Sequence, residues 1–330
     1  MKAVQISETG GPEVLKYVEL PMPVPKLGQV LIKAHSIGVC MPETMVRKGT
    51  YKWMPPLPLI PGIEMSGTVV ELGKNVTKLK LGQNVFVCAR EFEQRCGCYA
   101  EYLVANENAL YALPDAIDLE QVAGLANYQV AWHLLNSALK GFKYTSVLVV
   151  AAAGGVGTGL VQLAKAYGKR VIGVVSSKER GEFARSQGAD EIIVRGKLNV
   201  VEEVLRLTEG HGVDLVLDIV GGANMTDYFN CIDRFGLLLL YGRLQGPPTG
   251  NIDSGIERPP WNSAAFRHFT IHTLDNWPEL RAECTYDLIR MLHEEKIKVP
   301  IYDRIPLAEA ARAHQIFESG KVVGKLIMKP

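Results

Sequence analysis

The residues with the clearest chemical potential in this chain form a glycine-rich turn. An apolar run over 147–151 leads into a Gly-x-Gly-x-x-Gly spacing, with Gly154 and Gly157 in its second and third places and alanine in its first. A side chain at Gly154 would keep a pyrophosphate away from the backbone N–H groups that begin the following helix, where the helix dipole also favours an anion. The turn therefore predicts a dinucleotide cradle. Its expected contacts are Ala152, Gly154, Gly155, Val156 and Gly157.

The end of the next predicted strand indicates which dinucleotide the cradle holds. NAD-binding units usually carry an Asp or Glu there, about 20 residues past the fingerprint, to hold the ribose 2′-hydroxyl. This chain instead has Ser176 and Ser177 after the β-branched run 171–175. Lys178 and Arg180 follow, and hydroxyls with cations would bind a 2′-phosphate that a carboxylate would repel. We therefore expect NADPH as the cofactor; the alternative is an ordinary basic helix start exposed to solvent.

The elements around this turn predict a doubly wound parallel sheet. From about residue 120, short apolar segments alternate with amphipathic helical patterns, which is typical of strand–helix–strand units. The predicted parallel strands are 146–151, 170–175, 191–194, 215–218 and 236–241.

The two ends of the chain have a different sequence pattern from the middle. Short β-branched or alternating runs separated by Gly- and Pro-rich turns predict a mostly antiparallel β domain at the start. These runs are 2–6, 30–37, 68–72, 84–88 and 99–104. The tail holds a strand-like run at 271–274, helices at 279–294 and 307–319, and a final strand at 325–328. We expect a β-rich domain of residues 1–122 and 272–330 around a nucleotide domain of 123–271, with the active site in the cleft between them.

Composition limits the classes of protein that fit. The chain has 47% hydrophobic and 22% charged residues and a net charge of +1, so nothing in its charge favours nucleic acid or an anionic membrane. Its start lacks the apolar core of a signal peptide, and no apolar run is long enough for a membrane span. Six cysteines without a secretory signal indicate reduced thiols. We expect a cytoplasmic protein with no membrane or nucleic-acid partner.

Several motifs are spread over nearly the whole chain: IGVCMPETMVRKGTY (37–51), PGIEMSGTVVELG (61–73), GLANYQVAWHLL (124–135), AAAGGVG (151–157) and GKVVGKLIM (320–328). Together they resemble the medium-chain dehydrogenase/reductase superfamily, and the branch they look most like is the zinc-free quinone oxidoreductase or zeta-crystallin group. The resemblance implies an α/β chain with a GroES-like β-rich domain and a Rossmann domain. It also implies a homodimer.

The residues at the family's metal positions do not support zinc. A catalytic zinc needs about three protein ligands of Cys, His or Glu type. Cys40 stands at the family's first ligand position, but Ile63 replaces the His of its Gly-His-Glu motif. Cys96 and Cys98 are too few for the structural-zinc lobe. We therefore expect no metal and an acceptor that is already electrophilic, with a protein hydrogen-bond donor at the oxygen that gains charge.

The resemblance also implies residues at the site of chemistry. Tyr51 matches a tyrosine over the nicotinamide pocket, where its hydroxyl suits general-acid work; otherwise it packs against the 55–56 turn. Met41 stands where relatives commonly carry Asn, and because a thioether is a poor hydrogen-bonding partner, a more apolar pocket is expected. Asn127 and Tyr128 match a segment beneath the nicotinamide, or else they only pack the domain junction.

Further cofactor contacts are expected at the carboxyl ends of later strands, where open α/β sheets bind ligands. Arg195 aligns with a Tyr or His that touches the 2′-phosphate end in relatives. Lys325 is a candidate contact, or else a solvated lysine before the last strand. The remaining candidates, which ordinary turn chemistry also explains, are Gly221, Gly222, Tyr241, Gly242 and Arg243.

These observations lead to one prediction of function and two alternatives. The prediction is an NADPH-dependent oxidoreductase that reduces quinones or the activated C=C bonds of α,β-unsaturated carbonyls by hydride transfer. The alternative within enzymes is a reductase of enoyl thioesters such as acyl-CoA species. The alternative of another class is an NADPH-binding protein without turnover.

Overall fold

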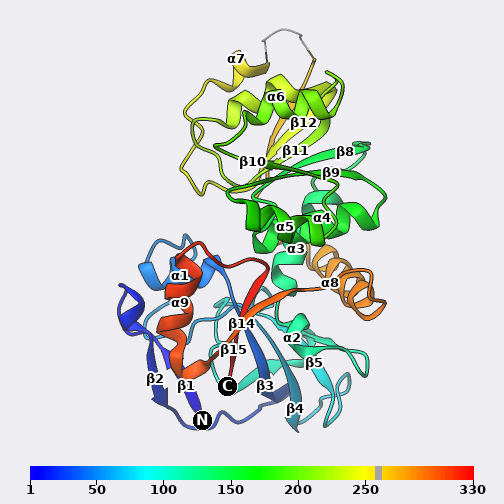
Figure 1. Cartoon of the computed structure of the whole chain (residues 1–330). Coiled ribbons are helices and arrows are strands. Elements are labelled where there is room, and N and C mark those ends of the chain that lie inside the picture. Colours follow the sequence, from blue (N-terminus) through cyan, green and yellow to red (C-terminus); the bar gives the residue numbers. More distant parts are fainter. Residues whose placement is uncertain (257–261) are drawn as a thin grey trace. The chain divides into compact units, whose positions relative to one another are not determined.

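The computed structural model describes residues 1–256 and 262–330, which form two compact units (Figure 1). The β-rich unit comprises Met1–Ala126 with Thr285–Pro330, and the parallel-sheet unit comprises Asn127–Cys284. The sequence-based boundaries, 1–122 with 272–330 against 123–271, place both junctions earlier along the chain. Helices α3 (Leu125–Leu135) and α8 (Pro278–His293) each carry residues of both units.

The β-rich unit is built on a seven-stranded sheet in the order β14-β15-β3-β4-β5-β7, with β6 also pairing with β3. Its neighbours run antiparallel except for β14 and β15, which are parallel. A separate antiparallel pair is formed by β1 (Lys2–Gln5) and β2 (Lys16–Glu19). The strands of the main sheet are β3 (Gln29–Val39), β4 (Glu64–Leu72), β5 (Asn84–Cys88), β6 (Tyr102–Asn106), β7 (Leu110–Ala112), β14 (Ile301–Pro306) and β15 (Lys325–Lys329).

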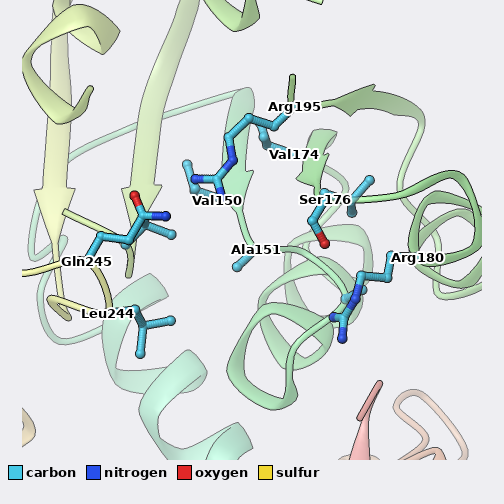
Figure 2. A pocket seen from close by; sticks show the side chains of 11 residues that line it. Val150, Ala151, Val174, Ser176, Arg180, Arg195, Leu244 and Gln245 are labelled. Atoms are coloured by element: carbon cyan, nitrogen blue, oxygen red, sulfur yellow. The ribbon is translucent and has the colours of Figure 1, made fainter. Parts of the chain in front are cut away.

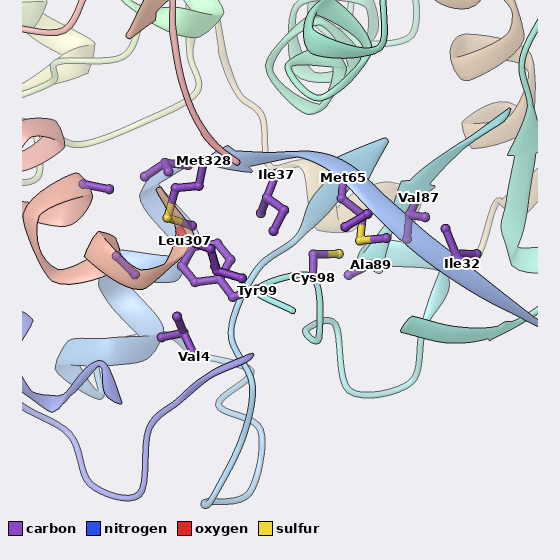
Figure 3. Close-up of a cluster of buried hydrophobic side chains, with 14 of the residues drawn as sticks. Val4, Ile32, Ile37, Met65, Val87, Ala89, Cys98, Tyr99, Leu307 and Met328 are labelled. Carbon is purple, nitrogen blue, oxygen red and sulfur yellow. The ribbon is translucent and has the colours of Figure 1, made fainter. Parts of the chain in front are cut away.

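Apolar side chains from these strands and from the segments beside them fill one core. Ile37, Met65, Tyr99 and Met328 each have 0% exposure, and Figure 3 shows them gathered with their neighbours. Burying such side chains is the main favourable term in folding, because apolar surface leaves water. The helices of this unit are α1 (Met41–Lys48), α2 (Leu119–Val122) and α9 (Ala310–Glu318).

The parallel-sheet unit has six strands in the order β10-β9-β8-β11-β12-β13, all parallel to their neighbours. The chain starts in the middle at β8, winds out to β10 and then returns to build the other half, so β8 and β11 flank the topological switch point. The strands are β8 (Ser146–Val150), β9 (Arg170–Val175), β10 (Glu191–Val194), β11 (Val213–Asp218), β12 (Ile232–Leu240) and β13 (Ala265–His268). Further helices are α4 (Gly155–Ala166), α5 (Lys178–Ser186), α6 (Val200–Leu207) and α7 (Ile252–Ile256).

The predicted fold class, an α/β chain with a β-rich domain and a doubly wound parallel sheet, is confirmed, and one predicted element is wrong. Ile271–Leu274 forms a 3₁₀ turn rather than a strand. The cause is local: the Thr270 side chain accepts a hydrogen bond from the His272 N–H, which bends the chain. Strand β13 was not predicted, since its sequence AFRH is largely exposed and lacks an apolar alternation.

His314 gives the β-rich unit a defined acid sensitivity. It is fully buried on α9, with Nε2 3.1 Å from the Tyr99 hydroxyl. Burial, with help from the charge of Arg47, lowers the pKa of His314 from 6.5 to about 4. The unfolded chain therefore takes up this proton at a higher pH than the folded chain, so acid favours unfolding between the two values.

We predict that His314→Gln flattens the pH dependence of the free energy of unfolding. In the unmodified chain this histidine should cost ~3 kcal/mol between pH 6.5 and pH 4, and urea titrations at several pH values measure that slope. The matched control is His293→Gln, which alters an exposed histidine of the same unit and should keep the original slope. A His314→Gln slope equal to the control's would contradict the assignment.

Candidate active site

A cavity of about 190 Å³ lies in the parallel-sheet unit at the carboxyl ends of β8, β9 and β11 (Figure 2). This is the switch point of the sheet, where the loops diverge and leave a crevice. The residues that line it are Val150, Ala151, Ala153, Val174, Val175, Ser176, Arg180, Arg195, Val220, Leu244 and Gln245.

The glycine-rich turn contributes Ala151 and Ala153 to the lining of this cavity, whereas Ala152, Gly154, Gly155, Val156 and Gly157 are not among the lining residues. Ala151 takes a left-handed conformation with φ 61°, directly after β8. Gly154 then caps α4 without a side-chain hydrogen bond. At Gly157 an added Cβ would lie 2.2 Å from the carbonyl oxygen of Ala151, so only glycine lets the helix approach the turn this closely. At Gly154 the nearest such contact is an ordinary 3.4 Å, so packing within the protein does not require glycine there.

Ser176, Arg180, Arg195 and Gln245 are the polar residues that line the cavity. Ser176 follows β9 and is exposed, and Arg180 is in the first turn of α5. Arg195 follows β10, where its N–H donates to the Val175 carbonyl over 2.8 Å. Figure 2 shows the two arginines reaching the cavity from these different elements.

The other predicted residues of this segment have local roles in the structure. The Ser177 hydroxyl caps α5 by accepting from the Arg180 N–H over 3.3 Å. Lys178 is exposed, with its ammonium 3.8 Å from the Glu182 carboxylate. Neither Ser177 nor Lys178 is among the described residues that line the cavity.

A buried carboxylate that sequence analysis missed shapes the loop after β11. Asp218 accepts hydrogen bonds from the Val220 N–H over 2.7 Å and the Gly221 N–H over 3.1 Å. Burial raises the pKa of Asp218 to about 6, although these hydrogen bonds and the charge of Arg195 oppose the rise. Gly221 has φ 64°, and a Cβ there would meet the Gly246 carbonyl oxygen at 2.7 Å. Asp218 thus fixes the turn that presents Val220 to the cavity.

The predicted residues after β12 support that loop. The Tyr241 N–H donates to the Asp218 carbonyl over 2.9 Å, and burial raises the pKa of the Tyr241 hydroxyl. A Cβ on Gly242 would lie 2.5 Å from the Ile219 side chain, and Arg243 is exposed. Gly222 also takes a left-handed conformation, with φ 71°. The lining residues Leu244 and Gln245 come next, and their position after a strand end was the only sequence signal for them.

Asn127 and Tyr128 lie in the first part of α3. Asn127 is partly exposed, whereas Tyr128 is buried and its pKa is raised by that burial. A Cβ on Gly159 of α4 would stand 3.4 Å from the Tyr128 ring. Tyr128 therefore packs α3 closely against α4.

Tyr51 and Met41 belong to the β-rich unit. The Tyr51 ring is partly buried against the apolar core, with its centroid 5.9 Å from that of Trp53. Met41 begins α1 and is 43% exposed. The Thr44 hydroxyl donates to the Met41 carbonyl over 2.8 Å, which fixes this first turn.

An ammonium group lies beside Cys40, the residue that stands at the first zinc-ligand position of the family that the sequence resembles. Lys325 Nζ lies 2.5 Å from Glu64 Oε1 and 2.8 Å from Cys40 Sγ. Burial raises the pKa of the Cys40 thiol well above its usual value. Ile63 offers no ligand atom, and among the described residues no three Cys, His, Asp or Glu side chains are arranged to hold a metal ion. These residues do not fit a zinc ion.

The described helices were also compared with the requirements for crossing a membrane. None of them combines the necessary length with the necessary apolar character.

Comparisons with known proteins agree with this architecture. Residues 26–115 match the family model of the alcohol dehydrogenase GroES-like domain, and residues 155–282 match that of zinc-binding dehydrogenases. A quinone oxidoreductase of Pseudomonas aeruginosa is 34% identical over 330 residues, which cover 100% of this chain and 99% of that protein.

Solved structures give the same result. A quinone oxidoreductase of Pseudomonas syringae pv. tomato DC3000 superposes with a TM-score of 0.86 at 31% identity, covering 100% of this chain and 99% of that one. The Escherichia coli quinone oxidoreductase, solved as a complex with NADPH, superposes with a TM-score of 0.85 at 28% identity over 100% of both chains.

A GroES-like unit joined to a Rossmann-type sheet with a glycine-rich turn defines a medium-chain oxidoreductase fold. The chain belongs to the medium-chain dehydrogenase/reductase superfamily, in its quinone oxidoreductase branch.

Proposed function

We propose that this chain is an NADPH-dependent reductase of quinones or of activated C=C bonds. The observation that carries the cofactor assignment is the lining of the cavity, to which Ser176, Arg180 and Arg195 supply a hydroxyl and two guanidinium groups. The described lining includes no carboxylate that would repel a phosphate. Guanidinium groups suit a 2′-phosphate because their donors bind its oxygens in pairs. The NADPH complex of the E. coli relative supports this assignment.

The glycine-rich turn between β8 and α4 supports a pyrophosphate site. Gly154 caps α4, so the first N–H groups of that helix lack intrahelical partners and favour an anion. Because no protein atom requires glycine at this position, the ligand's close approach accounts for it. Gly157 has the different task of bringing the helix against the turn.

The acceptor that we propose follows from zinc independence, which is part of the same proposal. Bound NADPH supplies a hydride, and a zinc-independent enzyme needs an acceptor that is electrophilic by itself, such as a quinone or an α,β-unsaturated carbonyl. The ammonium of Lys325 between Cys40 and Glu64 supports zinc independence. We assign Tyr51 the role of donating a proton to the oxygen of the acceptor. Enoyl thioesters remain the alternative acceptors, and binding without turnover the alternative function.

Arg180→Ala should reduce the preference for NADPH over NADH. We expect the ratio of the two kcat/KM values to fall by about tenfold or more, since a charge-assisted hydrogen bond to the 2′-phosphate is lost. Steady-state kinetics with each cofactor measure the ratio. Arg185→Ala, which removes an exposed arginine from the last turn of the same helix, should leave it unchanged. An unchanged ratio in Arg180→Ala would remove this residue from the site.

Two glycine variants separate the pyrophosphate role from packing. Gly154→Ala should keep the thermal unfolding temperature of the free protein but weaken NADPH binding by about tenfold or more, because its Cβ occupies space needed only by the ligand. Gly157→Ala should instead lower the unfolding temperature, since its Cβ would collide with the Ala151 carbonyl. Calorimetry of the free protein and fluorescence titration with NADPH test both. Equal affinity in Gly154→Ala and the unmodified chain would refute the assignment.

Tyr51→Phe tests the catalytic assignment. NADPH oxidation should be followed with 1,2-naphthoquinone and with crotonyl-CoA, and we expect kcat with the preferred acceptor to fall by about a hundredfold at unchanged NADPH affinity. Tyr17→Phe changes a tyrosine of β2 that is 41% exposed and serves as the control. Turnover of crotonyl-CoA alone would favour the thioester alternative. Tight NADPH binding without oxidation by either acceptor would favour a non-catalytic function.

A further inference from the structure

Three strand ends of the β-rich unit bring a buried ionic cluster together. Glu64 begins β4, Lys325 begins β15, and Cys40 directly follows β3. The register brings them to one end of the sheet, because β15 and β4 both pair with β3 near its carboxyl end. The side chains of Lys325 and Glu64 are only 2% and 0% exposed. We call Cys40, Glu64 and Lys325 the anchor cluster.

The two carboxylate oxygens of Glu64 have different partners. Oε1 accepts from Lys325 Nζ over 2.5 Å and from Cys40 Sγ over 3.1 Å. Oε2 accepts from the Ala126 N–H over 2.7 Å. Ala126 lies in the first turn of α3, where backbone N–H groups have no partner within the helix and the dipole favours a negative charge. Glu64 therefore caps α3 from a strand far away in the sequence.

Two glycines leave the space that this cap requires. A Cβ on Gly38 would lie 2.6 Å from the Glu64 side chain and 2.4 Å from the Ala123 carbonyl oxygen. A Cβ on Gly124 would lie 3.1 Å from Lys325 Cγ and 2.5 Å from the Val299 side chain. Close packing, rather than a turn, therefore requires glycine at both positions, and the anchor cluster supplies part of that packing.

Lys325 makes a buried carboxylate tolerable at this position. An ionised carboxylate inside a protein is strongly disfavoured unless a counter-charge and hydrogen bonds compensate for its lost hydration. The Lys325 ammonium supplies the charge and is held in turn by the Val39 carbonyl over 3.1 Å. The charge of Lys325 therefore acts on α3 through Glu64.

We propose that the anchor cluster is a positioning device that fixes the first turn of α3 and thereby orients Asn127 and Tyr128. Asn127 directly follows the anchored Ala126 N–H, and Tyr128 is the next residue of the same helix. The inference rests on the proposed function, together with the sequence-based expectation that these two residues lie beneath the nicotinamide. Lys325 is then a positioning residue and not a contact of NADPH.

The test uses the full-length protein and three variants: Lys325→Met, Glu64→Gln and the double variant. In Lys325→Met we expect about tenfold faster amide exchange over residues 125–129 and about tenfold lower kcat with 1,2-naphthoquinone. The dissociation constant for NADPH should change by less than about threefold, because the adenosine contacts lie elsewhere. The double variant has no unpaired charge and keeps an amide oxygen for the Ala126 N–H. Its exchange rate over residues 125–129 and its kcat should therefore be closer to those of the unmodified protein than in either single variant.

Glu107→Gln is the matched control. Glu107 is another buried carboxylate of the same unit, and it accepts from the Thr77 and Lys78 N–H groups over 2.9 and 2.6 Å. Replacing this carboxylate should lower the unfolding temperature without changing kcat or the amide exchange rate over residues 125–129. If Lys325→Met does not fold, Gly124→Ala disturbs the anchor cluster without removing a charge and should give the same exchange and kcat changes.

Two outcomes overturn the proposal. One is unchanged exchange at 125–129 in folded Lys325→Met or Gly124→Ala. The other is weaker NADPH binding in Lys325→Met that the double variant does not recover, which would assign Lys325 to cofactor contact instead. Amide exchange needs no turnover, so it tests the effect of the anchor cluster on α3 even if neither acceptor is reduced. A failure of the proposed function can therefore be told apart from a failure of this inference.

Discussion

The close approach of α4 to the turn after β8 is the constraint on which the cofactor site depends. With Gly157 against the Ala151 carbonyl, the helix begins at the edge of the sheet and its first N–H groups lie where the strands diverge. Strands β9 and β11, whose ends also line the cavity, are placed relative to that edge by parallel pairing with β8. A small change at this contact would therefore alter the positions of the helix start and the cavity together.

The β-rich unit solves a different problem, which is how to keep charged groups inside an apolar domain. The Glu64 carboxylate and the Cys40 thiol share one compensating cation, the Lys325 ammonium. The same unit encloses Arg47, whose guanidinium pairs with both carboxylate oxygens of Glu318 over 2.8 Å. In both cases a carboxylate partner compensates the buried cation for the hydration that it loses.

Local signals predicted the parts of the site that depend on neighbouring residues. The glycine turn and the strand 170–175 were visible because a strand, a turn and a helix follow one another directly. The contacts of Lys325 were harder to predict, since Lys325 lies 285 residues from Cys40 and 261 from Glu64, and only the fold brings them together. Leu244 and Gln245 carry no pattern of their own, because a lining role requires no particular side chain.

The burial of the cysteines has a consequence for the chemistry proposed for this chain. Quinones and unsaturated carbonyls alkylate thiolates, so a protein that handles them is at risk of modifying itself. Of its six cysteines only Cys96 is not fully buried, and burial raises the pKa of Cys96 to about 11. Since the thiolate is the nucleophile, protonated and enclosed thiols react slowly. The apolar packing that stabilises the fold would thus also protect the protein from its own substrates.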